Sequence, residues 1–233
     1  SVEDSLVDRK LNIIRLLTPG FNNSISNPGY IMDYPVGIRE NGGQYTHAVS
    51  WYIMALLKLS QNDKAYEYYQ MINPINRTSS KKECNIYKVE PYVIAGDIYS
   101  NKDNPARGGW TWYTGSSGWF YNIAITEILG LKRNGNILKI EPRVPSSWKN
   151  FEVSFKYIDT LYEIKVKFGE KSDIVIDESR IDENFITLKK QCWNSLNFLF
   201  FFTHNISITR TNNSCNHLSD SAGNKYKIPS TQP

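Results

Sequence analysis

Residues 45–59, YTHAVSWYIMALLKL, carry the pattern from which the fold follows. Their apolar side chains recur at intervals of three and four residues, which places them on one face of an α-helix. The predicted inward face consists of Tyr45, Ala48, Val49, Tyr52, Ala55, Leu56 and Leu59. Such a face must pack against other elements, so this stretch predicts a helical unit with its own core.

A second helix is expected directly after the first. Asn62 and Asp63 are good amino-terminal caps, and Pro74 stops a helix, so the segment between them predicts the second arm of a helical hairpin. An earlier helix is predicted over residues 6–17, before the breaker Thr-Pro-Gly at residues 18–20.

A third helix is predicted to begin at a Ser116 or Ser117 cap and to end at Gly130, which suits a left-handed exit turn. The intervening loops, residues 19–44 and 73–114, are long. Long loops in compact domains are usually functional or disordered. The glycine and aromatic residues of these two loops favour a functional role.

The period of the apolar residues changes at about residue 136. Two runs alternate between apolar and polar side chains and flank Asp159-Thr160, which predicts an antiparallel hairpin. The fold class is therefore mainly α followed by β. We expect helices in residues 1–133, a small antiparallel β domain in residues 134–188 and an irregular tail, rich in Asn, Ser and Thr, in residues 189–233.

The composition excludes several classes of protein. Hydrophobic residues make up 40% of the chain and charged residues 21%, so disorder throughout is not expected. The net charge of +4 is spread without a basic block, which argues against nucleic acid as a partner. The concentrated apolar run at residues 196–202 is far shorter than the roughly 20 residues of a membrane-spanning helix, so no membrane span is predicted.

The cysteines and the start of the chain indicate where the protein works. Cys84, Cys192 and Cys215 are odd in number and far apart, which indicates neither a metal site nor a redox pair and favours a reducing, cytoplasmic compartment. No metal or cofactor is predicted. The chain opens with Ser1 instead of Met and lacks a signal-peptide pattern, so we interpret it as part of a longer protein.

The first candidate site is RENGGQYTH at residues 39–47. Its Gly-Gly turn permits close approach of a ligand, and the helix that follows offers free N–H groups and a partial positive charge to an anion. His47 suits hydrogen bonding to phosphate, and Glu40 suits accepting hydroxyl protons from a sugar. The alternative is structural: Glu40 compensates the helix terminus, Arg39 is solvated and His47 is a buried, hydrogen-bonded side chain.

The second candidate site is GGWTWYTGSSGW at residues 108–119, a glycine-rich turn that leads into a helix. The Thr114 hydroxyl and the N–H groups near Gly115 and Ser116 are a candidate anion-binding nest, without the Gly-Lys-Ser/Thr ending of a nucleotide-triphosphate loop. Trp112 belongs to an aromatic group suited to stacking on pyranose rings, and Glu90 is a secondary candidate for sugar hydroxyls. Core packing of the aromatic residues and a structural role for Glu90 stay open.

Several motifs in the same order resemble glycoside hydrolase family 94, the family of cellobiose and chitobiose phosphorylases. They are NPGYI (27–31), YPVGIRENGGQYTHA (34–48), NPIN (73–76), YKVEPYV (87–93) and RGGWTWYTG (107–115). Within the family they are most similar to the phosphorylase-type domain of cyclic β-1,2-glucan synthases. The resemblance covers roughly residues 1–188.

The resemblance implies a fold and a reaction. Residues 1–133 would supply the last helices of an (α/α)6 barrel, and inorganic phosphate would attack the anomeric carbon of a β-glucoside with inversion. By this resemblance His47, Thr114 and Gly115 contact phosphate, and Arg39 and Glu40 hold the transferred sugar. The general acid of the family is an aspartate in a tryptophan-rich motif, which has no counterpart in this sequence.

The resemblance therefore implies no catalytic residue in this chain and no activity of the chain in isolation, since a general acid contributes a factor of about 10² to 10⁴. The expected partners are a β-glucan oligosaccharide, phosphate as co-substrate and the amino-terminal remainder of the parent protein. Association of that parent with the cytoplasmic side of a membrane stays open. The alternatives are a non-catalytic carbohydrate-binding remnant, a cellobiose or chitobiose phosphorylase fragment, and a purely structural helical domain.

Overall fold

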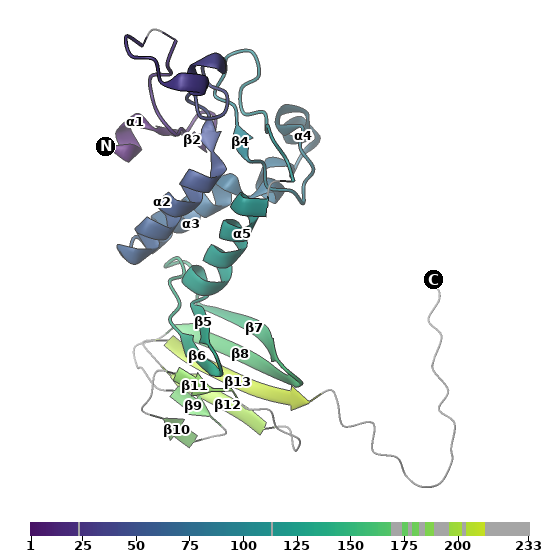
Figure 1. Cartoon of the computed structure of the whole chain (residues 1–233). Coiled ribbons are helices and arrows are strands. Elements are labelled where there is room, and N and C mark those ends of the chain that lie inside the picture. The colour runs from purple at the N-terminus through teal and green to yellow at the C-terminus, as the bar shows by residue number, and fades with distance from the viewer. Residues whose placement is uncertain are drawn as a thin grey trace, which may run out of the picture. The chain divides into compact units, whose positions relative to one another are not determined.

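Two antiparallel helices form the centre of the first part of the chain, α2 (Thr46–Lys58) and α3 (Asn62–Ile72) (Figure 1). The prediction of both helices is confirmed. The buried side of α2 differs from the predicted face, because Leu59 is 68% exposed and Ile53 and Leu57 are fully buried. The buried residues of α2 are Thr46, Val49, Ser50, Ile53, Leu56 and Leu57. The predicted face and the observed buried face of α2 both contain apolar residues, and which of them is buried depends on the elements that pack against the helix.

The computed structural model describes residues 1–22, 24–112, 114–168, 174–176, 179–181, 185–188, 196–201 and 204–212. The chain divides into two compact units. Residues 1–134 and 138–147 form the first, and residues 135–137 and 148–233 belong to the second.

A third helix, α5 (Thr114–Asn122), continues into a π-helical segment, Ile123–Ile128. The Phe120 ring stacks on Tyr69 of α3, with ring centroids 4.2 Å apart. The helix begins earlier than the predicted cap, so Ser116 and Ser117 lie inside its first turns. Gly130 has a φ of 73°, which is the predicted left-handed exit.

The helix predicted for residues 6–17 is absent. The elements there are α1 (Val2–Ser5), β1 (Val7–Asp8) and β2 (Ile13–Ile14), and the two strands are antiparallel. The Asp8 carboxylate accepts the backbone N–H groups of Lys10 at 3.1 Å and Leu11 at 3.0 Å. A side chain that bonds its own backbone in this way stabilises a turn against a helix, which explains the wrong prediction.

The long loops contain short elements of their own: η1 (Gly29–Asp33), β3 (Gln44–Tyr45), η2 (Pro74–Arg77), α4 (Lys81–Tyr87) and β4 (Asp97–Ile98). Helix α4 is not predicted, although it carries a cap. Ser80 Oγ accepts the Glu83 N–H at 3.2 Å, and Lys88 ends the helix in the left-handed conformation.

The second unit contains the predicted hairpin, β7 (Asn150–Tyr157) and β8 (Thr160–Phe168), with Tyr157 opposite Thr160. Tyr162, Ile164 and Val166 of β8 are fully buried. The order of helices followed by antiparallel strands is the predicted one. The other strands of the chain are β5 (Leu131–Asn134), β6 (Ile137–Ile140), β9 (Ile174–Ile176), β10 (Ser179–Ile181) and β11 (Phe185–Thr187).

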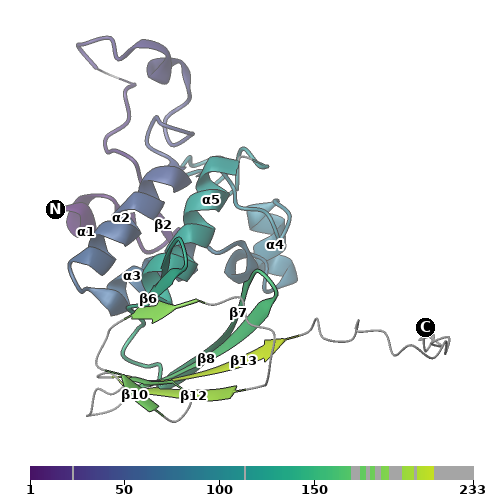
Figure 2. The same ribbon diagram turned by 60° about the horizontal axis from the view of Figure 1, so that its bottom comes forward.

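The segment predicted to be an irregular tail contains two further strands, β12 (Leu196–Phe201) and β13 (His204–Asn212). They complete a four-stranded sheet in the order β12-β13-β8-β7 (Figure 2). β13 pairs with β8 over its whole length, from His204 opposite Phe168 to Asn212 opposite Thr160. Here the structure differs from the prediction. Without β13, the edge of β8 would leave backbone donors and acceptors unpaired, and the local pattern of residues 196–212 does not reveal that this segment pairs with them. The remainder of residues 189–233 lies outside the described residues.

Candidate functional site

Two short strands bring the two glycine-rich segments together. β3 and β4 are antiparallel, with Gln44 opposite Ile98 and Tyr45 opposite Asp97. Ile98 also bridges to Gly108, so the segment that contains Trp110 lies on the other side of β4. Helix α2 begins directly after β3 and carries His47 in its first turn. Segments about 60 residues apart in sequence thus meet around β4.

The turn at residues 37–43 holds Arg39 in an uncommon backbone conformation. Gly37 N–H donates to the Asn41 carbonyl at 2.7 Å, and Gly43 N–H donates to the Arg39 carbonyl at 3.1 Å. A Cβ atom at Gly43 would lie 2.9 Å from that carbonyl oxygen, which leaves no room for a side chain. Arg39 has a φ of 51°, and such strained residues persist where the surrounding structure fixes them.

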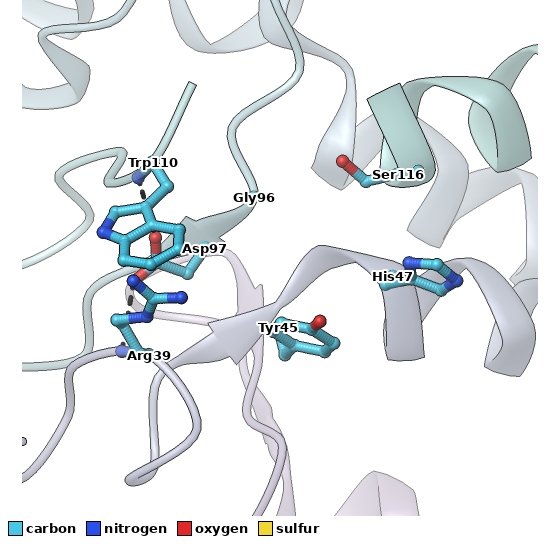
Figure 3. A pocket seen from close by; sticks show the side chains of 8 residues that line it. Arg39, Tyr45, His47, Gly96, Asp97, Trp110 and Ser116 are labelled. Carbon is cyan, nitrogen blue, oxygen red and sulfur yellow. Dashed lines mark hydrogen bonds between the residues drawn. The ribbon is translucent and has the colours of Figure 1, made fainter. Parts of the chain in front are cut away.

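Asp97 connects the two segments through its side chain. Its carboxylate accepts the backbone N–H of Arg39 at 3.1 Å and that of Trp110 at 2.9 Å (Figure 3). The residue is 2% exposed, and burial raises the pKa of its carboxyl against the lowering effect of the two N–H groups. A Cβ atom at Gly109 would overlap the Asp97 carboxylate, so this position requires glycine.

The Arg39 guanidinium lies over the Trp110 ring and 5.1 Å from the centroid of the Tyr34 ring. It forms an ion pair with Glu40, with 3.6 Å between Arg39 Nε and Glu40 Oε2. Arg39 Nη1 and Glu40 Oε2 are nevertheless buried without a hydrogen-bond partner among the described residues. A charged pair with unused hydrogen-bonding atoms is suited to a polar ligand.

His47 lies against the first turn of α5. A Cβ atom at Gly115 would be 3.3 Å from both Cε1 and Nδ1 of the imidazole, so the glycine allows this approach. The Trp51 ring packs edge-on against the imidazole with centroids 5.0 Å apart, and the Tyr45 ring is nearly parallel to it. The imidazole is therefore held beside the free N–H groups of a helix amino terminus.

A cavity of about 80 Å³ lies between these groups. This is several times the about 10–15 Å³ that one water requires. Figure 3 places Arg39, Asp97 and Trp110 together in the pocket and labels His47 and Ser116 at the start of the two helices. The lining residues are Arg39, Tyr45, His47, Gly96, Asp97, Trp110, Gly115 and Ser116.

The structure brings together some of the predicted site residues. Arg39, His47 and Gly115 line the cavity, and Glu40 reaches it through its ion pair with Arg39. Thr114 is the first residue of α5 and is exposed, next to the lining residues.

Glu90 and Trp112 form a separate contact. Trp112 Nε1 donates to Glu90 Oε1 at 3.3 Å, and the Tyr92 ring packs edge-on against Trp112 at 6.1 Å. The Trp112 side chain is 66% exposed, so the sequence alternative of core packing does not apply to this ring within the described residues.

Sequence reasoning missed Asp97 and Gly96 as lining residues. Tyr45 and Ser116 lie within the two predicted segments, and Ser116 was predicted to contribute its backbone N–H and not its side chain. Sequence reasoning also grouped structural residues with the site. Asn41 is 1% exposed and Gln44 is fully buried. Asn41 Oδ1 accepts the Phe21 N–H at 2.7 Å, and Gln44 Oε1 accepts the Ile14 N–H at 3.0 Å. Asn41 and Gln44 therefore stabilise the backbone of this segment through hydrogen bonds.

Two common alternatives find no support in the described residues. No group of three or more His, Cys, Asp or Glu side chains there is arranged to hold a metal ion. No helix within the same residues has both the length and the apolar content for crossing a membrane.

A helix amino terminus, an imidazole and a guanidinium thus line one small cavity, and groups of these kinds are suited to binding an anion. The chain belongs to the Glycosyl hydrolase 94 superfamily, since the model of its catalytic domain matches residues 1–130.

Three relatives illustrate the range of the similarity. The chain is 41% identical over 172 residues to the cyclic beta-(1,2)-glucan synthase NdvB of Rhizobium meliloti (strain 1021), covering 74% of this chain. It is 29% identical over 156 residues to an N,N'-diacetylchitobiose phosphorylase of Vibrio proteolyticus, covering 66% of this chain. It is 24% identical over 153 residues to a 1,2-beta-oligoglucan phosphorylase of Listeria innocua serovar 6a, covering 60% of this chain.

The matched regions span 6%, 19% and 14% of the lengths of these three relatives. The chain thus corresponds to a small part of each.

Proposed function

We propose that this chain forms the substrate-holding and phosphate-holding part of an inverting phosphorylase-type domain that acts on β-linked glucans. The observation that carries the proposal is the packing of the His47 imidazole against Gly115 at the start of α5, with 3.3 Å to a Cβ atom added there. An imidazole and a helix amino terminus that share one small cavity are suited to an anion the size of phosphate.

In this proposal phosphate is the nucleophile and the co-substrate, and no cofactor takes part. His47, Gly115 and Thr114 bind it, because the imidazole and the first N–H groups of α5 supply hydrogen-bond donors and partial positive charge. Donors that are already in place need no rearrangement as charge develops in the transition state, which is the largest single contribution in many enzymes.

The sugar lies on the other side of the cavity. Arg39 and Glu40 present unused hydrogen-bonding atoms there, Nη1 and Oε2. The Arg39 guanidinium lies over the Trp110 ring, and the carboxylate of Asp97 accepts the backbone N–H groups of both residues. Glu90 and the exposed Trp112 form a second contact for the oligosaccharide, since a rigid indole offers a wide apolar face.

The reaction needs one more group, an acid that protonates the leaving oxygen. We place this aspartate outside residues 1–233, in the remainder of a larger (α/α)6 barrel of which this chain supplies the last helices. The chain is then expected to bind ligands without turnover. The linkage we propose is β-1,2, because the relatives include a cyclic beta-(1,2)-glucan synthase and a 1,2-beta-oligoglucan phosphorylase.

The test uses β-1,2-glucooligosaccharide and inorganic phosphate. We expect the 233-residue chain to bind both by isothermal titration calorimetry and to release no glucose 1-phosphate. His47→Ala is expected to weaken phosphate binding by about 10-fold or more, the loss of one hydrogen bond to a charged group. Glu40→Ala is expected to weaken oligosaccharide binding and to leave phosphate binding within about 3-fold.

The proposed parent protein, in which this chain is joined to the rest of the barrel, provides the second arm of the test. Glucose 1-phosphate formed from β-1,2-glucooligosaccharide supports the proposal. Sugar phosphate formed instead from cellobiose or N,N'-diacetylchitobiose would assign the chain to another specificity within the superfamily. Unchanged binding in folded His47→Ala and Glu40→Ala variants would contradict the proposed site.

A second candidate function, carbohydrate binding without any catalytic role, rests on the exposed pair Trp112 and Tyr92, which are 66% and 75% exposed. It predicts oligosaccharide binding that does not depend on phosphate or on His47. Ligand-observed NMR of the His47→Ala variant, with and without phosphate, separates the two functions.

A further inference from the structure

The hydroxyl of Ser116 is buried at the cavity without a partner. Ser116 is 3% exposed and is the third residue of α5. Its Oγ has no hydrogen-bond partner among the described residues. The residue lines the same cavity as Gly115. Figure 3 shows it together with His47, which also lines this cavity.

The neighbouring serine shows the ordinary arrangement. Ser117 Oγ donates to the carbonyl oxygen of Thr114 at 2.9 Å, which is the usual way for a helical serine to satisfy its hydroxyl. Ser116 lies one position earlier on the same helix and has no such bond within the described residues. Buried hydroxyls in folded proteins are hydrogen-bonded in most cases, and leaving one unpaired costs free energy. The exception at Ser116 therefore indicates a partner that arrives as a ligand.

We propose that Ser116 Oγ donates a hydrogen bond to the phosphate ion bound between the amino terminus of α5 and His47. This inference rests on the proposed function and adds a binding residue to it. Because Gly115 has no side chain, the imidazole reaches the first turn of the helix, and Ser116 at the next position lines the same cavity.

The amino terminus of α5 favours an anion over a neutral ligand beside Ser116, because it contributes partial positive charge. Arg39 also lines the cavity, and its guanidinium is paired with Glu40. Asp97 is the acidic residue among the described lining residues, and both of its carboxylate oxygens already accept backbone N–H groups. A hydroxyl that donates to an ionised oxygen makes a stronger bond than one that donates to a neutral group.

The experiment compares Ser116→Ala with Ser117→Ala, a matched control on the same helix. Inorganic phosphate is titrated into each variant and into the unchanged chain at constant ionic strength, and binding is followed by ³¹P NMR and calorimetry. We expect Ser116→Ala to raise the phosphate Kd about 10- to 100-fold, as the loss of a hydrogen bond to a charged group requires. Ser117→Ala is expected to change it by less than about 3-fold.

Thermal unfolding without phosphate gives a second measurement. Because the hydroxyl has no partner in the described structure, Ser116→Ala is expected to unfold at the same or a higher temperature. Added phosphate is expected to raise the melting temperature of the unchanged chain more than that of Ser116→Ala.

The outcomes distinguish the two proposals. Equal phosphate binding by Ser116→Ala and the unchanged chain would overturn the role of Ser116 and leave the proposed function standing. An equal loss of phosphate affinity in Ser117→Ala would also overturn the role of Ser116, and so would an unfolded Ser116→Ala variant. In both cases the serine would act by stabilising helix α5 and not by binding phosphate. No phosphate binding by the unchanged chain would overturn both proposals.

Discussion

The carboxylate of Asp97 accepts the backbone N–H of Arg39, with 3.1 Å between Oδ2 and N. Its other oxygen accepts the backbone N–H of Trp110, so one buried side chain ties together the segments on both sides of β4. The Arg39 guanidinium and the Trp110 ring meet as a consequence. The geometry of this side of the cavity therefore depends on a buried residue whose two carboxylate oxygens both accept backbone N–H groups.

Replacing Asp97 with asparagine tests this dependence. An amide has one acceptor oxygen, so one of the two N–H groups would face an NH₂ group and lose its bond. We expect the free energy of unfolding of Asp97→Asn to fall by about 1–3 kcal/mol, measured by urea denaturation. The exposed Asp103→Asn variant is the control, with an expected change within about 0.5 kcal/mol. Equal stability of the two variants would show that the bridge is dispensable.

The same carboxyl predicts a pH dependence of stability. Burial raises the pKa of Asp97 in the folded chain above its unfolded value of about 3.9. Its contribution to stability is therefore fully present below pH of about 3.9 and is lost as the pH rises through the folded pKa. We expect the difference in free energy of unfolding between the unchanged chain and Asp97→Asn to shrink from acid toward neutral pH. Urea titrations at several pH values measure it, and a difference that grows with pH would contradict the sign.

Arg39→Lys tests the contact between the guanidinium and the Trp110 ring. Lysine keeps the charge and loses the flat guanidinium, which stacks on aromatic faces and presents several fixed donors. We expect oligosaccharide binding to weaken about 2- to 30-fold, the range of cation–π contributions. Arg107→Lys, at an exposed position, is the matched control. If calorimetry finds the same oligosaccharide Kd for both variants, the proposed role of Arg39 in sugar binding is contradicted.

Two glycines of α5 provide a matched pair of variants for testing the proposed phosphate site. A Cβ atom at Gly115 would lie 3.3 Å from the His47 ring, whereas a Cβ atom at Gly118 would meet nothing within 4 Å. Alanine favours a helix over glycine by about 1 kcal/mol. We expect Gly118→Ala to be stabilised by about that amount with unchanged phosphate binding. Gly115→Ala is expected to bind phosphate more weakly because the imidazole must move, and tighter or equal binding would be inconsistent with the proposed site.

The sequence was most informative where local pattern and packing agree. Helices α2 and α3 follow from three- and four-residue spacing and from their caps, and the β7-β8 hairpin follows from alternation. The prediction failed at residues 6–17, where the Asp8 side chain bonds the backbone and forms a turn. It also missed α4, whose cap, Ser80 followed by Glu83, was present as a signal.

The candidate site divides in the same way. Arg39, His47 and Gly115 stand out in sequence because charged groups and glycines precede helices. The carboxylate of Asp97 and the hydroxyl of Ser116 do not, since an aspartate in a loop and a serine side chain near a helix start are common in sequences. Burial makes them notable: Asp97 has both oxygens engaged, and Ser116 has a hydroxyl without a described partner.

The sequence by itself determined the helical hairpin, the β hairpin and the motifs that resemble the superfamily, because each depends on residues that are neighbours along the chain. Only the tertiary structure decided which stripe of α2 is buried, that β13 pairs with β8, and that residues 39–47 and 108–116 meet across β4. Those outcomes depend on contacts between distant segments, whose free energy comes from burial and from backbone hydrogen bonds that local periodicity does not encode.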